Sequence, residues 1–273
     1  MVRPRFPWWI LRPKFDGQPI FLLRSHKTAG QSFSLGLRAA FRPDEISPHY
    51  STWQYGKLSP TDLSQYSYLS GHVGRPTAAR VSPDSRLLTI LRNPVDRLIS
   101  SYFFWRSQVT RFPDTDHHDV ALRLQSMTLL DFVKSEEPVI RRAAWNVQAR
   151  LLAGADYGLE PAERTQLFGF EEDVESVIGR ALEGFQDFTL VGTVDRFEDS
   201  LRAAFRVLDL SGEPEFEFNN RTPSKFKDQG VTDEVLEYAR QMTEADQIVY
   251  DAANARLSEL TSTAGDRGRS RSR

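Results

Sequence analysis

A short polar loop near the N-terminus carries the first residues that could do chemistry. It runs from Arg24 to Ser32 and contains Lys27 and Gly30. A loop between a strand and a helix offers backbone N–H groups and the positive helix end to an anion. The pattern is not a standard P-loop, because the lysine precedes the glycine and the first glycine is missing. We interpret it as a phosphate cradle, although by itself an ordinary turn with a solvated lysine explains it equally well.

A second candidate lies at the end of the apolar run 86–91. Arg92 follows that run directly, and Ser100 lies about two turns into the helix that we expect next. A guanidinium fork and a hydroxyl suit a terminal phosphate. A nucleotide hydrolase of this architecture would usually carry a carboxylate here for Mg²⁺. The alternative is that Arg92 pairs with Asp96 and Ser100 faces solvent.

Two histidines are candidates for proton transfer. His72 follows the apolar run 66–70 and is flanked by Gly71 and Gly74. An imidazole titrates near neutral pH and can act as a general base. The alternative for His72 is a backbone-bonded histidine in a tight turn. His26 is a second candidate base or a phosphate contact, and its alternative is a solvated loop residue.

These residues depend on alternating strands and helices for their placement. Apolar runs bounded by turn formers predict strands over 19–23, 66–70, 86–91 and 188–192. Helical spacing and capping residues predict helices over 31–40, from Asn93 onward, and over 129–152, 171–184, 198–208 and 232–260. We expect polar loops over 108–119 and 219–230. Such alternation favours a parallel α/β sheet, whose ligands bind at the carboxyl ends of the strands, where both candidate loops lie.

Composition limits the possible functions. The 273 residues are 40% hydrophobic, which is enough for a full core. The formal net charge of −2 gives no global attraction to nucleic acid, so we expect no nucleic-acid partner. The absence of cysteine excludes disulfides, cysteine-ligated zinc and thiol catalysis. We interpret the histidine pair between Asp116 and Asp119 as part of a solvated loop, and we expect no metal site.

The N-terminal residues do not resemble a membrane segment. Pro4, Pro7 and Arg12 interrupt the apolar residues around Trp8, whereas a secretory signal or a membrane helix needs a longer apolar run. We expect a cytoplasmic protein without a transmembrane segment. The sequence does not assign an oligomeric state.

Taken together, the two loops resemble those of the carbohydrate sulfotransferases related to heparan sulfate 2-O-sulfotransferase and their bacterial relatives. The segment 26–30 is similar to that family's 5′-phosphosulfate loop, and 89–100 is similar to its 3′-phosphate loop. Further matches follow in order at 70–72, 146–154, 191–198 and 220–224, so the resemblance spans about residues 19–257. His26 stands where the family usually has proline, and Ser70 stands where some members carry a second histidine.

The resemblance implies a fold and a donor. The fold would be a single α/β domain, P-loop-NTPase-like, with three layers and a central parallel sheet. It would occupy residues 19–262, after an N-terminal extension (1–18) and before a disordered basic tail (263–273). The donor would be 3′-phosphoadenosine-5′-phosphosulfate (PAPS), used without a metal. The acceptor would be a hydroxyl group of a carbohydrate or a glycolipid.

It also implies roles for single residues. Lys27 would stabilise charge on the leaving phosphate oxygen, Arg92 and Ser100 would hold the 3′-phosphate, and His72 would be the base. Asp195 and Glu198 are expected to be structural partners of Arg196 or of the loops. The donor-binding residues that we expect are Arg24, His26, Lys27, Thr28, Ala29, Gly30, Gln31, Ser32, Arg92, Ser100, Thr222, Ser224 and Lys225.

Two other functions stay open at this point. A nucleotide-dependent kinase could use Asp195 to hold Mg²⁺, although the position of Lys27 and an arginine at the strand end argue against it. A non-catalytic module could bind the nucleotide without transferring the group.

Overall fold

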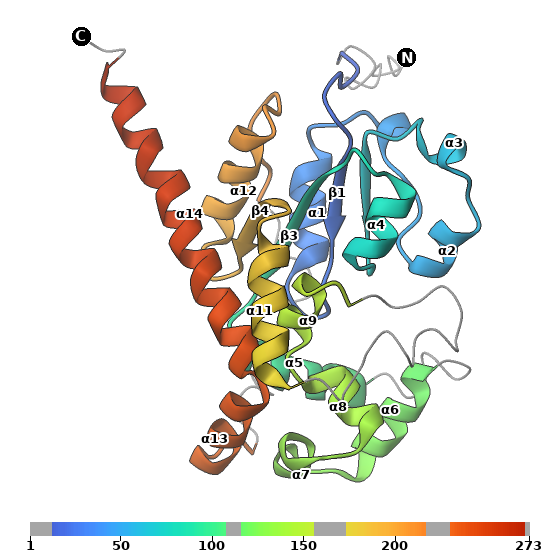
Figure 1. Ribbon diagram of the computed structural model, residues 1–273, viewed down its shortest axis with the longest axis vertical. Coiled ribbons are helices and arrows are strands. Elements are labelled where there is room, and N and C mark those ends of the chain that lie inside the picture. The colour runs from blue at the N-terminus through green and yellow to red at the C-terminus, as the bar shows by residue number, and fades with distance from the viewer. Residues whose placement is uncertain (1–12, 108–115, 156–172, 217–229, 271–273) are drawn as a thin grey trace, which may run out of the picture.

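The computed structural model describes residues 13–107, 116–155, 173–216 and 230–270 (Figure 1). Its centre is a parallel sheet with the strand order β2-β1-β3-β4. The strands are β1 (Ile20–Leu23), β2 (Tyr68–Gly71), β3 (Arg86–Leu91) and β4 (Phe188–Thr193). All four lie within two residues of the predicted runs, so the predicted strands are confirmed.

Side chains of successive strand residues enter two different cores. In β1, Phe21 and Leu23 pack into the core on one face, and Ile20 and Leu22 pack into the core on the other, as the two-residue period of a strand requires. Both cores are covered by helices, so the molecule has three layers. This confirms the predicted α/β fold with a central parallel sheet.

Each face of the sheet has its own helices. The core that contains Leu22 is covered by α1 (Gly30–Arg38) and α12 (Phe197–Val207). The core that contains Leu23 is covered by α2 (Thr52–Gly56), α4 (Arg75–Val81), α9 (Val147–Leu152) and α11 (Val174–Phe185). The long helix α14 (Glu244–Ser270) contributes Val249 to one core and Leu257 to the other. The one-turn elements η2 (Pro43–Glu45) and α3 (Pro60–Leu63) lie between α1 and β2 in the chain.

A third apolar core lies among helices beyond the sheet (Figure 1). Its helices are α5 (Pro94–Arg106), α6 (Asp116–Ser126), α7 (Leu129–Lys134), α8 (Pro138–Ala144) and α13 (Asp233–Met242). Because α5 begins directly after β3, this helical group packs at the carboxyl ends of the strands, where a ligand site is expected.

Two predicted helices are interrupted in the structure. The helix expected over 129–152 is three helices, α7, α8 and α9. Pro138 lacks the N–H group that a continuous helix needs, and Asn146 adopts a left-handed conformation with φ 42°. The helix expected over 232–260 breaks at Thr243, whose hydroxyl donates to the carbonyl of Ala239 at 2.7 Å and so competes for helical hydrogen bonds.

Two segments expected to be irregular contain helix. Helix α6 begins at Asp116, so the segment from Asp116 to Asp119 is helical, contrary to the expected loop, and residues 108–115 lie outside the described residues. Helix α14 continues to Ser270, into the expected disordered tail; once a helix is nucleated, each added residue gains one hydrogen bond. Among the described residues no helix is long and apolar enough to span a membrane. The expected domain boundaries stay a prediction.

Candidate functional site

The loop between β1 and α1 has a strained backbone. Lys27 and Ala29 have φ values of 65° and 54°, in the left-handed region, which costs a non-glycine residue about 1–3 kcal/mol. The loop is held by its own contacts, because the buried hydroxyl of Thr28 donates to the carbonyl of Ser25 at 3.1 Å. Strain of this kind collects at functional sites. The backbone geometry alone therefore indicates that this loop is a candidate functional site.

Gly30 packs closely against the side chain of Arg24. A Cβ atom on Gly30 would lie 3.1 Å from Cγ of Arg24, which is tighter than an ordinary van der Waals contact. The side chain of Arg24 thus limits the space for a larger residue at position 30. Burial lowers the pKa of Arg24. In the part of the chain that the structure describes, Nε of Arg24 and Oγ of Ser25 are buried without a hydrogen-bond partner.

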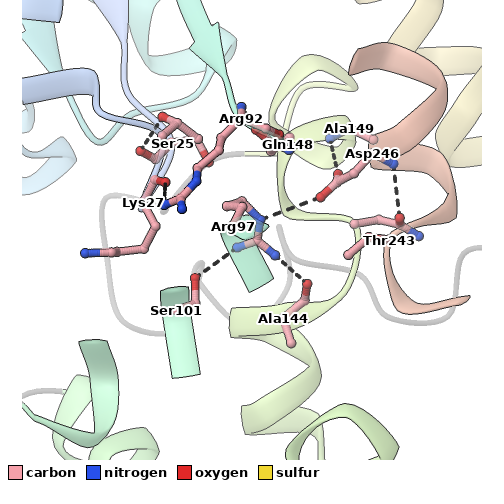
Figure 2. A network of polar contacts seen from close by, with 12 residues as sticks. Ser25, Lys27, Arg92, Arg97, Ser101, Ala144, Gln148, Ala149, Thr243 and Asp246 are labelled. Carbon is pink, nitrogen blue, oxygen red and sulfur yellow. Dashed lines mark hydrogen bonds and ion pairs between the residues drawn. The ribbon is translucent and has the colours of Figure 1, made fainter. Parts of the chain in front are cut away.

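Arg92 contacts the backbone of Lys27, so the two candidate loops meet (Figure 2). Nη1 of Arg92 donates to the carbonyl of Lys27 at 3.4 Å, and Nζ of Lys27 lies 4.3 Å from the ring centre of Phe104. Burial lowers the pKa of Lys27, and the charge of Arg92 lowers it further. Burial also lowers the pKa of Arg92. Within the described residues neither side chain forms an ion pair with a carboxylate.

Ser100 lies on the buried side of α5. That helix begins after Asn93, whose side chain accepts from the N–H of Asp96 at 3.2 Å. The described structure contains no ion pair between Arg92 and Asp96, and Ser100 is 4% exposed. Ser100 is therefore not solvated, contrary to the alternative interpretation of the second loop. Arg92 and Asp96 form no ion pair within the described residues, but the charge of Asp96 partly offsets the lowering of the pKa of Arg92 by burial.

His26 and His72 lie face to face. Their ring centres are 4.2 Å apart and their planes are inclined by 4°. His26 also contacts Trp105 of α5, with ring centres 5.6 Å apart. Nδ1 of His72 lies 3.0 Å from the carbonyl oxygen of Arg24. Because a carbonyl oxygen only accepts, this contact places the proton of the neutral ring on Nδ1 and the lone pair on Nε2.

The other expected donor-binding residues are spread over the loop and the first turn of α1. Ala29 is half-buried, Gln31 is exposed and Ser32 is buried. Thr222, Ser224 and Lys225 lie outside the described residues.

The charged residues after β4 have structural partners. Asp195 accepts a hydrogen bond from the hydroxyl of Tyr250. Glu198 pairs with Arg202 at 3.2 Å. Arg196 pairs with Asp199 at 3.0 Å, rather than with Asp195 or Glu198 as expected. Both contacts join residues three or four positions apart at the start of α12, where such residues are neighbours.

Gln148 is a residue of the site that the sequence did not reveal. Its side-chain amide bonds both backbone groups of Arg92: Oε1 accepts from the N–H at 2.8 Å, and Nε2 donates to the carbonyl at 2.9 Å. The motif around Gln148 contributed to the family resemblance, but nothing in it indicated a contact 56 residues away in sequence. Among the described residues no three His, Cys, Asp or Glu side chains gather as a metal site would require.

Comparison with known proteins identifies the family. The model of the Sulfotransferase family matches residues 26–251. This is well over half of the chain, which therefore belongs to the Sulfotransferase family and is a sulfotransferase.

Among solved structures, a sulfotransferase from Alicyclobacillus acidocaldarius is similar at 14% identity and a TM-score of 0.43. The match covers 83% of this chain and 96% of that chain. A comparison with curated proteins finds no significant match.

Proposed function

We propose that this sulfotransferase moves a sulfuryl group from PAPS to a hydroxyl of a carbohydrate or glycolipid acceptor, as enzymes related to heparan sulfate 2-O-sulfotransferase do. The observation that carries the donor assignment is the contact between Lys27 and Arg92. The guanidinium of Arg92 bonds the backbone carbonyl of Lys27 there, and its charge lowers the pKa of the desolvated Lys27 side chain. Within the described residues neither side chain forms an ion pair with a carboxylate, while the charges of Asp96 and Asp195 act on Arg92 from further away. Desolvated positive charges that influence each other favour a bound anion.

The residues present fit a donor that carries two separate anionic groups. Lys27 lies in one loop with Nε of Arg24 and Oγ of Ser25, which are buried and have no hydrogen-bond partner among the described residues. Arg92 and Ser100 lie at the end of the neighbouring strand and on the helix after it. When bound, PAPS would supply the activated sulfuryl group. We assign the first loop to its 5′-phosphosulfate and the second to its 3′-phosphate.

The residues of this chain would share the work of the transfer. Lys27 would stabilise negative charge as it develops on the leaving phosphate oxygen. His72 would take the proton of the attacking hydroxyl on Nε2, since Nδ1 is occupied by the carbonyl of Arg24. The contact of His72 with the first loop supports an acceptor that approaches beside the donor. We propose a cytoplasmic location and no metal requirement.

Donor preference tests the proposal. Titration calorimetry should show that the protein binds adenosine 3′,5′-bisphosphate (PAP) more tightly than 5′-AMP, which lacks the 3′-phosphate. Arg92→Ala should weaken PAP binding about tenfold or more by removing a charge-assisted contact. Arg202→Ala is the matched control, because Arg202 pairs with Glu198 on the exposed side of α12. Equal affinity of the wild-type protein for PAP and 5′-AMP would overturn the donor assignment.

Turnover separates transfer of a sulfuryl group from transfer of a phosphoryl group. With labelled PAPS and a panel of glycans and glycolipids, we expect sulfated products that form equally well in EDTA. ATP should not replace PAPS as donor. Loss of activity in EDTA would contradict the proposed metal-free reaction.

A further inference from the structure

The backbone of Arg92 is paired by a side chain instead of by a neighbouring strand. β3 ends at Leu91, and beyond that point the N–H and carbonyl of Arg92 are both bonded by the amide of Gln148 (Figure 2). A primary amide carries both a donor and an acceptor, so it can pair both groups of one residue. Buried backbone groups left unpaired would cost free energy. Gln148 therefore fixes the backbone of Arg92 where the sheet no longer does.

Gln148 is itself held firmly. Its side chain is 0% exposed, and the neighbouring Ala149 donates its N–H to Oδ1 of Asp246 at 2.7 Å. Oδ1 of Asn146 accepts from the N–H groups of Ala245 and Asp246, at 3.0 and 3.2 Å. Helix α9 is thus tied at its start to the start of α14.

The same network reaches the helix that carries Ser100. Asp246 pairs with Arg97 of α5 at 3.7 Å, and both side chains are 0% exposed. Arg97 also donates to Oγ of Ser101 at 3.2 Å and to the carbonyl of Ala144 at 2.8 Å (Figure 2). One buried network therefore joins the backbone of Arg92 to the residue next to Ser100.

We propose that Gln148 is a positioning residue for the donor: it holds Arg92 so that the guanidinium points to the first loop, where it meets the carbonyl of Lys27. Asn146, Asp246 and Arg97 keep Gln148 in place. This inference rests on the proposed function, in which Arg92 binds the 3′-phosphate. It assigns part of the donor affinity to a residue that does not touch the donor.

The test combines Gln148→Leu, Arg92→Ala and the double variant. In Gln148→Leu we expect hydrogen exchange of the Arg92 amide to quicken at least tenfold and PAP affinity to fall about tenfold. Affinity for 5′-AMP should not change. In the Arg92→Ala background, Gln148→Leu should cause no further loss of PAP affinity, because the effect passes through Arg92. Gln241→Leu is the control, since Gln241 lies on the exposed side of α13 and bonds Glu237.

Each result distinguishes a positioning role of Gln148 from a general loss of structure or of nucleotide binding. Unchanged exchange at Arg92, equal losses for PAP and 5′-AMP, or a further loss in the double variant would overturn the inference. If Gln148→Leu does not fold, Gln148→Glu serves instead: its carboxylate still accepts from the N–H of Arg92 but cannot donate to the carbonyl. Since the N–H stays bonded in this variant, its readout is the loss of PAP affinity at unchanged affinity for 5′-AMP, and equal losses would overturn the inference. The proposed function fails separately, through equal binding of PAP and 5′-AMP by the wild-type protein, while the exchange measurement still reports what Gln148 does to Arg92.

Discussion

The imidazole rings of His26 and His72 are stacked, with their centres 4.2 Å apart, although they come from different loops. His26 belongs to the loop after β1, and His72 follows β2, the neighbouring strand of the sheet. A second imidazole therefore lies on His72 even though Ser70 occupies the position at which some related enzymes carry a second histidine.

We predict that His72→Ala loses about 10²–10⁴-fold in the rate of sulfation, the usual contribution of a positioned general base. PAP affinity and the melting temperature should remain close to those of the wild type. The control is His49→Ala, because the contact that His49 makes with Tyr55 through its backbone carbonyl survives the change. Full activity in His72→Ala would move the base to another group.

Lys27→Ala should impair turnover more than donor binding. Charge on the leaving oxygen grows only in the transition state, so its stabiliser acts on kcat. We expect kcat to fall by about two to three orders of magnitude. Steady-state kinetics distinguishes the roles: an increase in KM at unchanged kcat would make Lys27 a binding residue only.

Anion binding should return a proton to Lys27 at alkaline pH. Burial and Arg92 lower the pKa of Lys27 in the free protein, so between that depressed value and the ordinary one the side chain is largely neutral. A bound phosphate favours the charged form and raises the pKa again. PAP binding in this window should take up protons, detected by calorimetry in buffers of different ionisation heats. Lys27→Met should abolish the uptake; uptake that persists in this variant would assign it to another group.

The Arg97–Asp246 pair should behave as a coupled buried unit. Asp246→Asn keeps an acceptor for the N–H of Ala149 but removes the carboxylate that faces the buried guanidinium of Arg97, which should lower the free energy of unfolding by about 3–5 kcal/mol. In Arg97→Met/Asp246→Asn both charges of the pair are removed, and much of the loss should be recovered. Urea denaturation of the wild type, the two single variants and the double variant measures these free energies of unfolding. Additive losses in the double variant would mean that the two residues act independently.

The strands and both loops were predictable because their signals are local. The run 86–91 is apolar and bounded by polar residues, and β3 occupies the same residues. Pro138 was also a visible signal for the end of a helix, but the apolar spacing on both sides of it suggested one continuous helix.

The unpredicted features depend on distant partners. Asn146 takes a left-handed conformation while its side chain accepts from the N–H groups of Ala245 and Asp246. Gln148 reaches Arg92, and His26 reaches His72. None of these pairs is close in sequence, so no local pattern could indicate them. The roles of Thr222, Ser224 and Lys225 stay predictions.

The two outer strands of the sheet have a consequence for association between molecules. An unpaired strand edge is a template on which another chain can add a strand and aggregate. The outer side of β2 is occupied by the segment 45–51, for example through the N–H of His72 and the carbonyl of Tyr50 at 2.9 Å. On the other side, α14 contacts β4 and packs into the cores on both faces, so it passes along that edge. Helix α14 thus covers the edge of β4 and prevents intermolecular strand pairing there. A chain without α14 would expose the edge of β4, which favours aggregation, and would also lose Asp246.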